Sequence, residues 1–270
     1  MSKFNVLCRI SPNLMNGKYP NMPDVVVKGV NQKVVILGQK LKNVVQTKEY
    51  QFDQVFDFRS SQEDIFNYLS KGILDNLFDG NNCSIIAYGQ ANSGKSYTIH
   101  GILNDLKNRG LLPRFLDSIF DKIKNSYRRI SIKITALEIN NGKLMDLLND
   151  NKQIKLYDNE KGKNNYENAN EIEVYSAEEA MKLIYSSHRK IFSSRTSSNE
   201  YSPSHTLYKI YITQNIVDIK DSIKSVFNLV DLAGSGNISS QKNLFPSENK
   251  EIKRSLCSLE TVMHSITKRN

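Results

Sequence analysis

Gly89-Gln90-Ala91-Asn92-Ser93-Gly94-Lys95-Ser96 fits the phosphate-binding pattern GxxxxGK[ST] and directly follows an apolar run at residues 83–88. In loops of this type a strand delivers the chain, backbone N–H groups surround phosphate oxygens, and a helix begins at the Lys-Ser pair. We expect all eight residues to contact a nucleotide, with Lys95 at the outer phosphates and the Ser96 hydroxyl on Mg²⁺. The stretch therefore predicts an α/β fold with a nucleoside triphosphate site at the end of a strand.

The composition is that of a globular protein with a basic surface. The chain has 270 residues, of which 39% are apolar and 24% charged, and its net charge is +9. This charge indicates an acidic partner, whether a polynucleotide, an anionic membrane or an acidic protein, unless it is plain surface lysine. The three cysteines form no CxxC pair, and no run is long enough to span a membrane. We therefore expect reduced thiols in a soluble, intracellular protein.

Strand and helix signals alternate along the chain, which favours a mixed sheet with covering helices in one domain over residues 1–270. A polar stretch at 158–170 is expected to be a solvated loop. The strands are expected at 4–10, 25–37 (a hairpin broken near Gly29), 52–56, 83–88, 130–139, 207–217 and 223–230. One helix is expected to begin at residue 61, a second directly after the phosphate loop, and others at 113–123, 176–185 and 248–266.

A second element of the nucleotide site lies at residues 226–234, where an apolar strand ends in Asp231 and DxxG follows. A carboxylate at a strand end can hold the water shell of Mg²⁺, and the N–H of Gly234 can approach the γ-phosphate. Guanine specificity requires an Asn-Lys-x-Asp box, and residues 151–154 read NKQI instead. Adenine is therefore favoured, and Arg9, Pro12 and Tyr97 are available to hold it.

Several motifs, in order, resemble those of the kinesin motor domain, and together they cover nearly the whole chain. Residues 87–98 are similar to AYGQTGSGKTxTM, 109–114 to RGIIPR, and 138–148 to EIYNEKIYDLL. Residues 231–235 are similar to the start of the second switch, DLAGSE, and 252–259 to INKSLSAL. Residues 9–12 match RxRP except that Ser11 replaces the second arginine.

The resemblance implies a kinesin-type P-loop NTPase, with a central mixed, largely parallel sheet and helices on both faces. It implies ATP or ADP with Mg²⁺, an adenine held by Arg9, Pro12 and Tyr97, and a microtubule docked on the helix that carries Lys253 and Arg254. Hydrolysis would depend on Lys95, Ser202, Ser204, Asp231 and Gly234, and the metal on Ser96, Ser204 and, through water, Asp231. The expected location is the cytoplasm, on the microtubule cytoskeleton, with no membrane or nucleic-acid partner.

The chain departs from the kinesin pattern in both switches. Residues 199–205 read NEYSPSH where the family has NxxSSRSH, so that one residue and the arginine are missing and Pro203 stands nearby. Gly236 stands where the family has a glutamate. In kinesins these two residues form an ion pair that closes the switches, so we expect retained ATP binding with weakened hydrolysis; Arg195 is an alternative source of the cation.

Other departures are milder or concern the flanking regions. Ala91 and Asn92 replace Thr-Gly in the loop, and Asn tolerates positive φ well, so weakened rather than abolished binding is expected. Kinesins continue beyond the helix at 248–266, so the C-terminal part of the motor core is expected to be missing, with any dimer partner contacted through absent flanking regions. Three functions remain open: an ATP-driven motor, a degenerate non-stepping module that binds microtubules or a partner motor, and, remotely, a nucleic-acid-binding ATPase.

Overall fold

The computed structural model describes residues 4–11, 25–41, 44–158, 164–166, 169–197, 204–215, 222–235 and 246–267. The chain divides into two compact units, one within residues 1–65 and a larger one that begins at Phe66. The expectation of a single domain over the whole chain stays a prediction.

The first unit contains two small sheets. Strand β1 (Leu7–Arg9) pairs in parallel with β5 (Gln54–Phe56). Strands β2 (Val25–Val30), β3 (Val34–Leu41) and β4 (Val44–Gln51) form an antiparallel sheet, so the predicted hairpin at 25–37 gains a third strand. The register shifts between Val27 and Gly29, which agrees with the predicted break.

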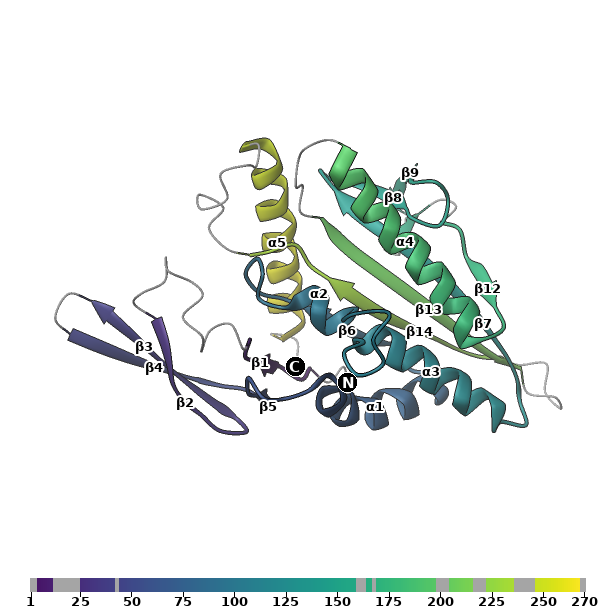
Figure 1. The fold of residues 1–270 in the computed structure, drawn as a ribbon. Helices are drawn as coiled ribbons and strands as arrows, with labels where there is room; N and C mark the ends of the chain where they lie inside the picture. The colour runs from purple at the N-terminus through teal and green to yellow at the C-terminus, as the bar shows by residue number, and fades with distance from the viewer. Residues whose placement is uncertain are drawn as a thin grey trace. The chain divides into compact units, whose positions relative to one another are not determined.

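The second unit is built on a seven-stranded sheet (Figure 1). Its order is β6 (Cys83–Ala87), β14 (Ser222–Asp231), β13 (His205–Asn215), β7 (Arg129–Asn140), β8 (Lys143–Asp146) and β9 (Lys152–Ile154), and β12 (Ile172–Val174) also pairs with β7.

The sheet is mixed, as predicted, but the expectation that it is largely parallel is wrong. Among the described pairings in this sheet, β6 with β14 is parallel and the others are antiparallel. For β7 and β8 the reason is a short connection, because a tight turn can join only antiparallel neighbours. Strands β7 and β8 are joined by Asn141 and Gly142 alone, at φ 49° and 73°, as a two-residue hairpin turn requires.

Five helices are described: α1 (Gln62–Phe78), α2 (Lys95–Ile99), α3 (Leu111–Lys124), α4 (Ala177–Ser197) and α5 (Pro246–Thr267). The predicted cap of α4 is confirmed, because Ser176 Oγ accepts from the N–H of Glu179 at 3.1 Å. The helix continues twelve residues beyond the predicted end at 185, to Ser197. Within the predicted loop at 158–170, β10 (Leu156–Asp158) pairs with β11 (Asn164–Tyr166), so that expectation is wrong in part.

The sheet carries helices on both faces, as predicted. On β13, Tyr208, Ile210 and Ile212 are fully buried on one face, where Tyr208 lies against Ser187 of α4. Side chains alternate along a strand, so His205 lies on the opposite face. There His205 bonds to Ser255 of α5. No described helix is long and apolar enough to cross a membrane.

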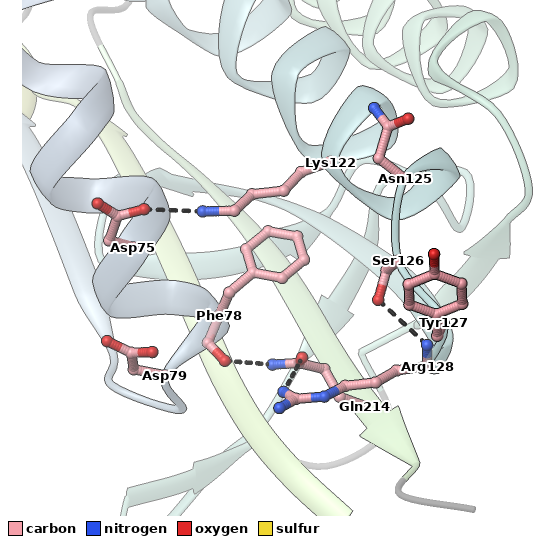
Figure 2. A pocket seen from close by; sticks show the side chains of 9 residues that line it. All are labelled: Asp75, Phe78, Asp79, Lys122, Asn125, Ser126, Tyr127, Arg128 and Gln214. Carbon is pink, nitrogen blue, oxygen red and sulfur yellow. Dashed lines mark hydrogen bonds and ion pairs between the residues drawn. The ribbon is translucent and has the colours of Figure 1, made fainter.

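A cavity of about 640 Å³ lies where α1, α3 and β13 end, at the opposite end of the sheet from the phosphate loop. Figure 2 shows that its polar groups bond to one another: Lys122 reaches Asp75 at 2.8 Å, and Gln214 accepts from Arg128 at 3.0 Å and donates to the carbonyl of Phe78 at 2.7 Å. These contacts connect α1, α3 and β13 to one another, so the polar groups named here have structural partners. The candidate site is therefore sought at the other end of the sheet, beside the phosphate loop.

Candidate nucleotide site

The phosphate loop begins two residues after β6, and α2 begins at Lys95, as the sequence predicts. Asn92 has φ 60°, so the prediction that an asparagine can take a glycine-like conformation here is confirmed. Gly94, the residue before α2, has φ 94°. Gly89, at the start of the loop, has φ 152°, so three residues of positive φ lie in the stretch that connects the strand to the helix.

Lys95 folds back over the loop. Its Nζ donates to the carbonyl of Gln90 at 2.6 Å. Burial lowers the pKa of Lys95, and the nearby Asp231 carboxylate opposes that shift. An ammonium group held inside the loop by the Gln90 carbonyl is available to an anion that replaces this contact.

Ser96 and Asp231 meet although they are 135 residues apart. Strand β6 pairs in parallel with β14, which brings Asp231 opposite Ala87 and next to the loop. The Ser96 Oγ donates to Asp231 Oδ2 at 2.5 Å. A hydroxyl and a carboxylate are the hard oxygen ligands that Mg²⁺ prefers, and few protein ligands are typical where phosphates complete its shell. The two residues therefore fit the predicted metal.

The segment after β14 lies directly against the phosphate loop. The N–H of Leu232 donates to the carbonyl of Ala87 at 3.3 Å, and that of Ser235 to the carbonyl of Gly89 at 3.0 Å. A Cβ at Gly234 would lie only 2.6 Å from the backbone nitrogen of Ala91. Gly234 is therefore required by close backbone contact, in addition to its predicted approach to the γ-phosphate.

The three predicted adenine-binding residues are distributed over the chain. Tyr97 is 38% exposed, and its hydroxyl donates to Asn108 Oδ1 at 3.1 Å. Arg9 lies in the first unit, where its guanidinium donates to Gln62 Oε1 at 2.8 Å. Pro12 lies outside the described residues. The adenine contacts stay a prediction.

The first switch is described only at its end. Ser204 is buried, and its hydroxyl donates to Glu138 of β7. Ser202, Pro203 and Gly236 lie outside the described residues, as does the side chain of Arg195. The predicted roles of Ser202 and Ser204 at the metal and in hydrolysis therefore remain predictions, as does the loss of the ion pair.

A hydrogen-bond chain links the segment after Asp231 to α5. The Nδ1 of His205 accepts from the N–H of Ala233 at 3.0 Å, so its Nε2 carries the proton and donates to Ser255 Oγ at 2.7 Å. Ser255 in turn donates to the carbonyl of Ile252 at 2.8 Å. Burial lowers the pKa of His205, which favours this neutral form.

Four residues of this region were not singled out by sequence reasoning: His100, Asn108, Glu138 and Ser255. Glu138 and Ser255 fall within motifs that resemble those of kinesins, which is a usable signal. His100 and Asn108 carry no comparable local signal, because their partners are set by tertiary packing.

Comparisons with known proteins find one family along this chain. The family model described as the kinesin motor domain matches residues 9–270. Kinesin-like protein KIP1 of Saccharomyces cerevisiae is 34% identical, over 81% of this chain and 23% of its own length. Kinesin-like protein 3 of Schizosaccharomyces pombe is 31% identical, over 99% of this chain and 48% of its own. A solved structure of a fast kinesin matches with a TM-score of 0.81 at 26% identity, over 93% of this chain and 71% of that one. The chain thus spans less than half the length of either curated relative.

Proposed function

The chain belongs to the kinesin motor domain family, and we propose that it binds ATP or ADP with Mg²⁺ and docks on microtubules but hydrolyses ATP slowly. Kinesin motor domains are microtubule-stimulated ATPases. The contact of Ser96 with Asp231 beside the phosphate loop is the observation that carries the binding part of the proposal. When bound, Mg²⁺ would neutralise phosphate charge at these two residues.

Slow turnover is inferred from the two switches. In kinesins an arginine and a glutamate pair across them, and this chain has Pro203 and Gly236 in that region. Loss of one partner would leave a charge without its counter-ion, which is destabilising where the charge is buried. Loss of both partners removes the ion pair that closes the switches without that energetic cost. Nucleotide binding needs the phosphate loop, while fast hydrolysis needs both switches closed on the γ-phosphate.

Docking is supported by the surface of α5. Lys253 and Arg254 are exposed, while Ile252 on the same helix is 6% exposed and faces the interior. A basic helix surface of this kind suits the acidic surface of tubulin, and its binding should weaken with salt. Microtubules in the cytoplasm are the proposed partner and location.

The second candidate is a module that grips microtubules or a partner motor without stepping. Two assays separate the slow ATPase from the non-stepping module: microtubule co-pelleting with ATP, ADP or no nucleotide, and measurement of phosphate release under the same conditions. Pelleting that depends on nucleotide, with slow but measurable turnover, supports the proposal; pelleting without turnover supports the module. Turnover equal to that of an ordinary kinesin contradicts the slow step. Lys95→Ala is the control that removes the nucleotide response.

A charge-restoration series tests the cause of slow turnover. Gly236→Glu alone should leave phosphate release unchanged, because the new carboxylate has no arginine to meet. Combining it with Pro203→Arg should raise microtubule-stimulated phosphate release severalfold. Full activation by Gly236→Glu alone would show that another cation, such as Arg195, already serves as the partner.

A further inference from the structure

A buried histidine lies behind the proposed metal ligands. His100 directly follows α2, and its side chain is only 3% exposed. Its Nε2 lies 3.9 Å from Oδ2 of Asp231, the same oxygen that accepts from Ser96 Oγ at 2.5 Å. The loop hydroxyl and the imidazole therefore both approach the same carboxylate oxygen of Asp231.

The charge and the tautomer of His100 follow from its surroundings. Burial and the neighbouring His188 lower the pKa of His100, which favours the neutral ring. Its Nδ1 has no hydrogen-bond partner among the described residues. A buried N–H without an acceptor costs more than a bare ring nitrogen beside apolar atoms, so the proton belongs on Nε2, which faces Asp231.

Packing alone does not account for a histidine at this position. The ring makes edge contacts with His188, at 4.6 Å between centroids, and with Tyr208, at 5.2 Å. A leucine or methionine could fill such a space without burying a nitrogen that lacks a partner. The feature that an apolar side chain would lack is a ring nitrogen 3.9 Å from the carboxylate oxygen.

We propose that His100 is a positioning residue for Asp231, whose carboxylate it holds by an Nε2–H contact in the orientation that supports the water shell of Mg²⁺ when a nucleotide is bound. At 3.9 Å the contact is longer than a hydrogen bond. Hydrogen bonds at such sites are often long in the ligand-free protein and shorten in the complex. Groups that orient metal ligands in this way typically contribute about 10- to 100-fold in metal affinity. The inference rests on the proposed binding of a nucleotide with Mg²⁺.

Two amide variants separate positioning from packing. In His100→Gln the amide nitrogen takes the place of Nε2 and keeps a donor near Asp231, whereas in His100→Asn the amide takes the place of Nδ1 and cannot reach it. The probe is ADP with a fluorescent label, whose dissociation constant is measured in Mg²⁺ and again in EDTA, in the full chain. Thermal unfolding of the nucleotide-free protein reports whether each variant folds. If His100→Asn does not fold, His100→Met takes its place as the variant without a donor.

The expected result is a loss of about tenfold in ADP affinity for His100→Asn in Mg²⁺, with less than a twofold change in EDTA. His100→Gln should bind within about threefold of the wild type in Mg²⁺. Equal losses in Mg²⁺ and EDTA, or wild-type binding by the Asn and Met variants, would overturn the positioning role. If the wild type itself fails to bind ADP in Mg²⁺, the proposed function fails, which is a distinct outcome.

Discussion

Gly234→Ala is expected to separate the segment after β14 from the phosphate loop. The new Cβ would lie 2.6 Å from the backbone nitrogen of Ala91 and 2.8 Å from its Cα, whereas ordinary contact begins at 3.4 Å. Both atoms belong to the backbone, so no rotation of a side chain relieves the overlap. The segment has to move by well over half an ångström, away from the loop on which the nucleotide is proposed to bind.

The cost can be worked out from the contacts that such a movement breaks. The bond from the Ser235 N–H to the carbonyl of Gly89 is 3.0 Å long and would be lost or stretched. One hydrogen bond of this kind contributes about 1 kcal/mol, and overpacking of a tight contact costs about 1 to 3 kcal/mol. We therefore expect the free energy of unfolding to fall by about 2 to 4 kcal/mol, which lowers Tm by roughly 5 to 15 °C.

Thermal unfolding of the nucleotide-free protein measures this effect, and two further variants test its cause. Ala91→Gly in the Gly234→Ala background should restore little stability, because the nitrogen and Cα of residue 91 stay in place. Gly72→Ala is the matched control: a Cβ there meets no atom within 4 Å, and alanine favours the helix, so it should be neutral or stabilising by up to about 1 kcal/mol. A neutral Gly234→Ala, or rescue by Ala91→Gly, would refute the reasoning.

Two further predictions concern α5 and the thiols. Ser255→Ala should lower the free energy of unfolding by about 1 kcal/mol and speed amide exchange in α5, because His205 loses its acceptor. The hydroxyl of Ser258 bonds only within the helix among the described contacts, so Ser258→Ala should change neither the free energy of unfolding nor the rate of amide exchange. Equal effects of the two substitutions would contradict the role of His205. A thiol reagent at pH 8 should label the exposed Cys257 before Cys83, because burial raises the pKa of the Cys83 thiol and leaves less thiolate. Labelling of Cys83 should then accelerate with rising pH, measured by mass spectrometry against Cys257→Ser, and a rate independent of pH would contradict this.

Local sequence signals predicted the local features of this chain. The phosphate loop, the start of α2 at Lys95 and the cap of α4 at Ser176 depend on residues within a few positions of one another. The conformation of Asn92 followed from the known tolerance of asparagine for positive φ. The resemblance to kinesin motor domains is confirmed, because the family model matches residues 9–270.

Features that depend on distant residues were missed or predicted wrongly. The sheet was expected to be largely parallel, whereas β14 pairs in parallel with β6 and antiparallel with β13, and no local pattern states which strands become neighbours. Short strands such as β12, with three residues, carry too few alternating positions to be recognised. Glu138 meets Ser204 across 66 residues of sequence because β7 and β13 are paired in register, so its role is visible only once the sheet is assembled.

The described contacts give α5 a connection to the proposed nucleotide site that does not depend on the ion pair between the two switches. Asp231 and Gly234 flank Ala233, whose N–H is bound by His205, and His205 is bound to Ser255 of α5. These hydrogen bonds connect each group to the next, so displacement of the segment at Gly234 should strain the bond between His205 and α5. None of these contacts uses Pro203 or Gly236. Microtubule affinity should therefore differ between the ADP-bound and nucleotide-free protein even where phosphate release is slow. His205→Ala should abolish that difference while leaving ADP binding within a few-fold of wild type; a difference that persists in this variant would place the coupling elsewhere.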